Sequence, residues 1–253
     1  MKKLFIAITA IFMLASCSKQ KDDVTPAPTG KTKRMVKADY LDDYGQPASD
    51  HISYDAQGRM SVYTDDDRRY EFDYQSNSFL KVVCKKLSDN TLIRTLECDL
   101  NDKGAITKIL YKDPQGVMTY RYQYTYNADG YISRVEGSAT LNEDMVQDYV
   151  FVNGNAVSSK LYYHGVLYHN REYSYDSRSN KSPFGNPGLW PSDKLFGKCY
   201  ANHLIEYKDF DPSGVLTWHQ KYIDEFDADG YLTKITTQDI FNSLTYSYAI
   251  TYQ

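Results

Sequence analysis

The chain repeats one short turn pattern, in which an Asp or Asn is followed by two residues and a Gly. Six copies are Asp55–Gly58, Asn101–Gly104, Asp113–Gly116, Asn127–Gly130, Asp211–Gly214 and Asp227–Gly230. In such a turn the Asx side chain can hold the backbone, and the glycine takes a left-handed conformation that a side chain disfavours. A type I turn followed by this glycine commonly joins two antiparallel strands. The pattern therefore predicts β-hairpins along most of the chain.

The stretches between the turns have the alternation of β-strands. Tyr120–Tyr126 places its tyrosines on one face and Arg121, Gln123 and Thr125 on the other. This period of two is typical of a strand with one buried face. Expected turns near residues 55, 77, 101, 127, 153 and 176 recur at similar intervals, and a second turn falls between several of them. Two strands per repeat predict a meander of roughly sixteen strands.

Apolar residues that follow the turns are spaced three apart, as in Ile106 and Ile109 or Leu232 and Ile235. A regular strand would point such a pair to opposite faces. Either a bulge follows each turn or both faces of the sheet are partly covered. Because so many strands must twist and curl, we expect an all-β domain formed by a strongly curved sheet or incomplete barrel with a concave, Tyr-lined inside.

An insertion at residues 177–202 interrupts the repeat late in the chain. It replaces a tight turn, contains Phe184, Trp190 and Phe196, and includes a short helix expected at residues 192–196. A long apolar loop in a compact domain either fills a space or has a function. Two interpretations remain open: the aromatic residues cover an open end or face of the sheet, or the loop rims a binding site where Trp190 stacks on a ligand.

The N-terminus resembles that of bacterial lipoproteins. Leu14–Cys17 is similar to a lipobox, and the apolar stretch before it is too short to remain as a membrane-spanning helix. This resemblance implies a signal peptide at residues 1–16 and lipid attached to Cys17. Residues 17–33 are then a flexible tether, and residues 34–253 form a single β-repeat domain.

The residues after the lipobox predict where the protein is displayed. Ser18–Asp23 resembles the acidic export tag that sends some lipoproteins to the outer face of the outer membrane. Acidic pairs are also common in solvated linkers. We therefore expect an outer-membrane lipoprotein exposed at the cell surface, with a periplasm-facing anchor as the alternative.

The repeats themselves resemble a known class. Their pattern, an aromatic residue, any residue, Tyr-Asp, two residues and Gly, is similar to the YD-type repeats of bacterial surface proteins. It is more similar still to an uncharacterised family of Tyr-rich lipoproteins, with a domain of unknown function, from gut-type Gram-negative bacteria. Residues 75–78 depart from the pattern because they lack the Gly. The resemblance implies a β-sheet and a cell-envelope location, and it implies no activity.

Three cysteines remain besides the one expected to carry lipid. Cys84 and Cys98 fall on strands that we expect to be neighbours, so they form either a disulfide or, as we favour, two buried thiols. Cys199 has no partner at the spacing of a zinc or redox motif.

Motifs for catalysis, nucleotide phosphates or metal ions are absent from the sequence. The five histidines are scattered, and we interpret each as a polar strand or loop residue. We expect no enzyme, no metal and no cofactor. The net charge of −4 argues against a nucleic-acid partner, because phosphate binding needs clustered Lys and Arg.

Two kinds of function remain. The first is a surface module that binds a glycan or a protein, since 25 tyrosines offer rings and hydroxyls. The second is an envelope scaffold or carrier that holds an apolar ligand or a partner segment in the concave sheet. The candidate ligand-binding residues are Trp190, Phe184, Phe196, Trp218, Tyr122 and Tyr124.

Overall fold

The computed structural model describes residues 33–41, 46–139, 144–182, 190 and 194–253, which hold sixteen strands. The expected signal peptide, Cys17 and all of the tether except Lys33 lie outside these residues. The strands are β1 (Met35–Leu41), β2 (Pro47–Tyr54), β3 (Met60–Thr64), β4 (Arg68–Tyr74), β5 (Phe79–Lys86), β6 (Leu92–Leu100), β7 (Ile106–Lys112), β8 (Met118–Tyr126), β9 (Ile132–Ala139), β10 (Asp144–Val152), β11 (Asn155–Tyr163), β12 (Val166–Ser179), β13 (Asn202–Phe210), β14 (Leu216–Phe226), β15 (Leu232–Asp239) and β16 (Leu244–Tyr252). No helix among the described residues is long and apolar enough to cross a membrane.

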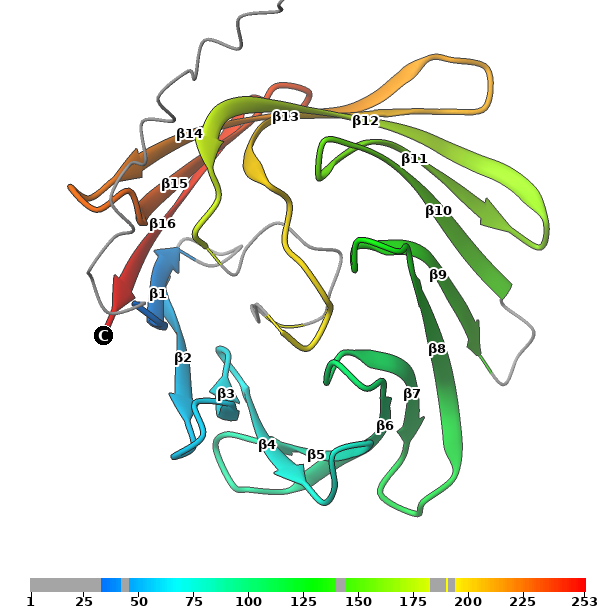
Figure 1. Ribbon diagram of the computed structural model, residues 1–253, viewed down its shortest axis with the longest axis vertical. Helices are drawn as coiled ribbons and strands as arrows, with labels where there is room; N and C mark the ends of the chain where they lie inside the picture. Colours follow the sequence, from blue (N-terminus) through cyan, green and yellow to red (C-terminus); the bar gives the residue numbers. More distant parts are fainter. Residues whose placement is uncertain (1–32, 42–45, 140–143, 183–189, 191–193) are drawn as a thin grey trace, which may run out of the picture. The chain divides into compact units, whose positions relative to one another are not determined.

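The antiparallel sheet closes into a barrel (Figure 1). Each strand pairs with its neighbours in the sequence, and β1 pairs with β16, where Ala38 lies opposite Ile250. An open sheet would leave unpaired backbone groups along two edges, and closure removes both edges. The all-β meander and the number of strands are confirmed, whereas the expectation of a sheet or barrel that stays incomplete is wrong.

All six repeated turns have the conformation that their sequence predicts. Their glycines have φ between 73° and 90°. In each turn, Oδ1 of the first residue accepts a hydrogen bond from the backbone N–H four residues later, at 2.8–3.0 Å. These local contacts fix the turn before any distant strand has to pair.

A β-bulge follows each of these turns and explains the apolar spacing of three. Between β6 and β7, Asp99 pairs with Lys108 and Leu100 pairs with Ile106, so Thr107 is the extra residue. Its hydroxyl donates to the Asp99 carbonyl at 3.2 Å. The extra residue returns Ile106 and Ile109 to the same, buried face. Five bulges carry this Thr or Ser hydrogen bond, from Thr107, Thr119, Ser133, Thr217 and Thr233.

The described residues 194–201 of the insertion run inside the barrel before β13 (Figure 1), and Trp190 belongs to the same buried core. We call residues 190 and 194–201 the inner segment. Backbone N–H groups join it to the barrel wall: that of Ile106 donates to Leu195, that of Lys198 to Gly130 and that of Ala201 to Gly154, at 2.8–3.0 Å. The inner segment is therefore part of the folded core.

Two local expectations fail around this insertion. A turn was expected near residue 176, but β12 continues to Ser179 and pairs there with Asn202 of β13. Part of the helix expected at residues 192–196 lies outside the described residues, and the part that is described, 194–196, forms a turn. Pairing with β13 extends β12 beyond the point where local sequence alone would end it.

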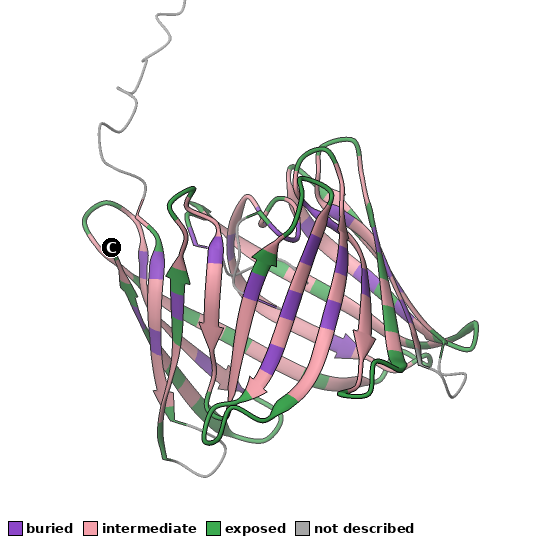
Figure 2. Cartoon of the chain, turned by 90° about the horizontal axis from the view of Figure 1, so that it is seen from below, coloured by how far each residue is buried: buried purple, intermediate pink, exposed green. Residues whose placement is uncertain are grey.

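The outer wall of the barrel carries ion pairs. Buried positions lie along the strands between less buried ones (Figure 2). Glu71 lies between the inward-facing Tyr70 and Phe72 and pairs with Lys85 at 2.8 Å across the strands. Further outer pairs join Lys112 to Glu97, Arg134 to Asp148, Lys208 to Glu206 and Lys234 to Glu225. A barrel that spans a membrane has an apolar outer band, and charges there are costly. The outer wall with its ion pairs therefore differs from such a band.

Candidate functional site in the polar half of the barrel

Buried polar residues occupy only one side of the barrel interior. Among the described residues they are Gln147, Ser159, Ser182, His203, Asp209, Thr237 and Asp239, so all lie from β10 onward. On β1–β9 the buried residues are apolar or aromatic. We call the inner wall of β1–β9 the apolar half, and that of β10–β16 with residues 180–182 the polar half. Since buried polar groups are costly, the polar half is where a function is to be sought.

The apolar half is filled by the inner segment. Trp190 is 4% exposed and Phe196 is fully buried. The Trp190 ring meets Phe72 edge-on at 5.0 Å between ring centres, and Phe196 meets Tyr124 at 5.4 Å. Such aromatic pairs add to the free energy gained from burial. Trp190 and Phe196 thus pack against the wall of this half.

Both cysteines of neighbouring strands β5 and β6 lie in the apolar half. Cys84 and Cys98 are free and fully buried, as two thiols. Burial raises the pKa of Cys98 to about 12, so its thiol stays protonated. These cysteines therefore act as small core residues.

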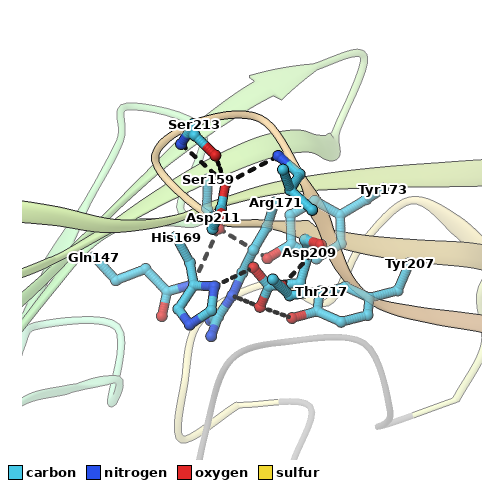
Figure 3. Close-up of polar contacts among 11 residues, drawn as sticks. Gln147, Ser159, His169, Arg171, Tyr173, Tyr207, Asp209, Asp211, Ser213 and Thr217 are labelled. Atoms are coloured by element: carbon cyan, nitrogen blue, oxygen red, sulfur yellow. Dashed lines mark hydrogen bonds and ion pairs between the residues drawn. The ribbon is translucent and has the colours of Figure 1, made fainter. Parts of the chain in front are cut away.

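A network of polar side chains covers part of the polar half (Figure 3). Asp209 on β13 accepts hydrogen bonds from Arg171 Nε at 3.1 Å and from the Tyr207 hydroxyl at 2.9 Å. Its other oxygen lies 2.7 Å from His169 Nδ1. The buried carboxylate thus has a guanidinium to balance its charge, as a stable buried ion pair requires.

Neutral groups continue this wall on β10–β12. Gln147 donates to the Ser159 hydroxyl at 3.0 Å, and that hydroxyl lies 2.9 Å from the Tyr173 hydroxyl. Burial raises the pKa of Tyr173, so the phenol stays protonated. Each of these side chains has a partner within the wall, which makes this network a structural element.

A cavity of about 380 Å³ lies beside β13–β16. Its apolar lining comes from Leu204, Leu232, Ile235 and the rings of Tyr222 and Tyr248. Neighbouring strands place these side chains together, since Asp224 lies opposite Ile235 and Ile235 lies opposite Tyr248. The volume is within the range of small-molecule sites.

His203 and Asp224 form the polar end of this cavity. Continuing the β13–β14 register beyond Glu206 and Lys221 places them opposite each other. The His203 and Asp224 side chains are 4% and 5% exposed, and His203 Nδ1 is 3.5 Å from Asp224 Oδ2. Within the described part of the chain, six buried side-chain atoms have no hydrogen-bond partner, and they are His203 Nε2, Asp224 Oδ1, His169 Nδ1, Asp209 Oδ1 and the hydroxyl oxygens of Tyr175 and Tyr252. Of these residues, His203 and Asp224 line the cavity.

The electrostatics of the cavity are set by Asp224. None of the described residues that line the cavity is a Lys or Arg. Burial raises the pKa of Tyr222 to about 12, and the charges of Tyr173 and Asp224 act in the same direction. Tyr222 is therefore a neutral phenol at physiological pH, and it donates to Gln220 at 2.8 Å. The cavity is thus a mostly apolar space with a buried carboxylate at one end.

The sequence-predicted binding residues do not form one group. Trp190, Phe196 and Tyr124 are buried in the apolar half, and Tyr122 packs 6.2 Å from Tyr124. Trp218 is 36% exposed and lies opposite Asp209. Phe184, like Cys17, lies outside the described residues. None of the candidates that the structure describes lines the cavity of the polar half.

Sequence reasoning missed His203 and Asp224. A usable signal was present, because Asp224 alternates with Tyr222 and Phe226 and so shares the face that the aromatic residues define as inward. His203 could not be paired with it, since the β13–β14 register is needed. Three histidines in fact lie beside carboxylates: His169 with Asp209, His203 with Asp224 and His219 with Glu206. Among the described residues, no three His, Cys, Asp or Glu side chains are grouped so that they could hold a metal ion.

Two solved structures share this fold. One is a porin-like protein from Bacteroides uniformis, 16% identical, with a TM-score of 0.67 over 88% of this chain and 98% of that chain. The other is a porin-like protein from Bacteroides vulgatus, 11% identical, with a TM-score of 0.61 over 87% of this chain and 98% of that chain. Comparison with protein-family models and with curated proteins gave no match. At these identities the likeness shows a common barrel fold.

Proposed function

We propose that the protein is a non-enzymatic binding protein of the bacterial cell envelope that holds a small ligand inside its barrel. The observation that carries this proposal is the cavity with two unpartnered polar atoms on buried side chains, His203 Nε2 and Asp224 Oδ1. Native proteins rarely leave such groups without a partner, and exceptions are common at functional sites. A bound molecule with matching polar groups would give these two atoms hydrogen-bond partners.

Of the two functions expected from the sequence, the carrier is the better supported. Binding of a glycan on the sheet needs exposed aromatic faces, but Tyr122 and Tyr124 pack against each other and Tyr124 also packs against Phe196. Trp218 is the candidate that remains partly exposed. The apolar wall of the partly open cavity instead offers space for a small molecule.

We propose that a lipid on Cys17 anchors the protein to the outer membrane. The barrel would then lie in water at the cell surface or, alternatively, on the periplasmic side. The lipobox-like Leu14–Cys17 supports the anchor. The porin-like neighbours from Bacteroides support an envelope setting for the fold. The charged outer wall and the packed inner segment argue against a pore that spans the bilayer. We also propose that nucleic acid is not a partner of this protein.

The test is recovery of small molecules from the purified full-length protein. Ile235→Trp fills the cavity, whereas Ile223→Trp, on β14 between Tyr222 and Asp224, points outward at 51% exposure and serves as the control. Mass spectrometry of denatured extracts should find a compound in the wild type and the control that is depleted in Ile235→Trp. Circular dichroism confirms that both variants fold. The proposal fails if the wild type carries no compound and binds none from a small-molecule library.

A further inference from the structure

We propose that the cavity binds a small organic ammonium ion with an apolar body, whose charged group contacts Asp224 and His203. This inference rests on the proposed function, namely that the cavity is a ligand site. It adds the chemical class of the ligand, which follows from the charge, the hydrogen-bonding capacity and the walls of the cavity.

The charge argument comes from two His–Asp pairs within the same barrel. Asp209 has a partly buried guanidinium partner, because Arg171 Nε donates to it at 3.1 Å. Asp224 is equally buried and has its own histidine, but no Lys or Arg lies among the described residues that line the cavity. A buried carboxylate without a cation is costly. A ligand cation would take the place at Asp224 that Arg171 takes at Asp209.

The hydrogen-bonding argument concerns the two unpartnered atoms. Asp224 Oδ1 is a carboxylate oxygen and can only accept. In a neutral imidazole whose Nδ1–H faces Asp224, Nε2 of His203 is also an acceptor. Two acceptors at one end of a cavity require two donors from the ligand. A primary ammonium group supplies three N–H donors together with the positive charge.

The rest of the lining fits the apolar body of such a ligand. Leu204, Leu232 and Ile235 supply aliphatic contacts, and Tyr222 and Tyr248 supply aromatic rings. A cation near a tyrosine ring gains a further attraction when both are shielded from water. The volume of about 380 Å³ accommodates an arylalkyl amine.

The test compares three probes of one shape on the full-length protein by titration calorimetry. 2-Phenylethylamine carries an ammonium, 2-phenylethanol is its neutral counterpart, and 3-phenylpropanoate is an anion. We expect the wild type to prefer the amine over the alcohol by at least about tenfold and not to bind the anion. This ranking needs no variant, so it holds as a test even if a substitution prevents folding.

Variants then assign the preference to one residue. Asp224→Asn keeps the shape of the side chain and should weaken amine binding at least about tenfold while leaving the alcohol within about threefold. Asp148→Asn, on the outer wall beside Arg134, should change neither. Ile235→Trp should abolish binding of both the amine and the alcohol.

The outcomes separate the inference from the proposed function. Equal binding of amine and alcohol, or tighter binding of the anion, would overturn the ammonium ligand. If Ile235→Trp still removed that binding, the cavity would stand as a ligand site for another class. If no probe bound and no compound co-purified, both proposals would fail. An unchanged amine affinity in Asp224→Asn would overturn the role of the carboxylate.

Discussion

The two halves of the barrel interior use the same wall for different purposes. In the apolar half, the inward faces of β1–β9 close around Trp190, Leu195 and Phe196 of the inner segment. In the polar half, the strands from β10 onward carry the buried polar residues and leave the cavity beside β13–β16. The repeated hairpins, turns and bulges are common to both. Among the described residues, most of the buried core cluster therefore lies in the apolar half, whereas the cavity lies in the polar half.

The largest effect should follow loss of the aromatic contacts in the apolar half. Phe196→Ala removes a fully buried ring that contacts Tyr124 and Trp190. We expect the free energy of unfolding to fall by about 3–5 kcal/mol, because the cavity left behind adds to the lost burial. Urea unfolding measures this. The control Phe241→Ala, at 57% exposure, should change stability by less than about 0.5 kcal/mol. Equal effects of the two variants would mean that the inner segment is not core.

The two buried aspartates give the next largest difference. Asp209→Asn leaves Arg171 inside the wall without its anion, so we expect a loss of about 2–3 kcal/mol. Asp224→Asn removes a buried charge that has no cation in the cavity wall. Its stability without ligand should stay within about 1 kcal/mol of the wild type or rise.

Unfolding of both variants in urea, after removal of bound small molecules, checks this difference. A loss in Asp224→Asn as large as that in Asp209→Asn would show that Asp224 is a structural residue. The distinction between a buried carboxylate with a guanidinium partner and one without it would then break down. A rise in stability would instead match a site where stability is sacrificed for binding.

Adding a methyl group where the inner segment lies close to the wall should reduce stability by a smaller amount. Gly197 has φ of +72°, and a Cβ there would lie 2.5 Å from the Gly130 carbonyl oxygen. Gly116 has a similar φ of +84° with no atom in the way. We expect Gly116→Ala to cost about 1 kcal/mol from backbone strain and Gly197→Ala to cost about 1–2 kcal/mol more. Comparing the thermal unfolding of the two variants isolates the effect of the contact with the Gly130 carbonyl oxygen. If both variants lost the same stability, the inner segment would have shifted to accommodate the methyl group.

What the sequence predicts well in both halves is local. The turn at Asn127–Gly130 and its bulge depend on contacts within a few residues, which the order of residue types specifies. Closure of the barrel depends instead on β1 and β16, at opposite ends of the folded chain. The pairing of His203 with Asp224 depends on the register of two strands around a hairpin. Both pairings follow from the register of the whole sheet, so short sequence motifs could not predict that His203 and Asp224 lie together.

The smallest effect tests whether the two halves share one hairpin design. Thr107 in the apolar half and Thr233 in the polar half each donate from the hydroxyl to a backbone carbonyl at their bulge, at 3.2 and 3.1 Å. Valine keeps the branched shape and removes the donor, so each Thr→Val change should cost about 0.5–1 kcal/mol. Thr→Ser at the same positions should keep most of the hydrogen bond, and urea unfolding of the four variants separates the hydroxyl from the methyl group. Because the bulge is built in the same way in both halves, the two valine variants should lose the same stability. If Thr107→Val lost stability and Thr233→Val did not, the two halves would differ in how their bulges are stabilised as well as in their buried side chains.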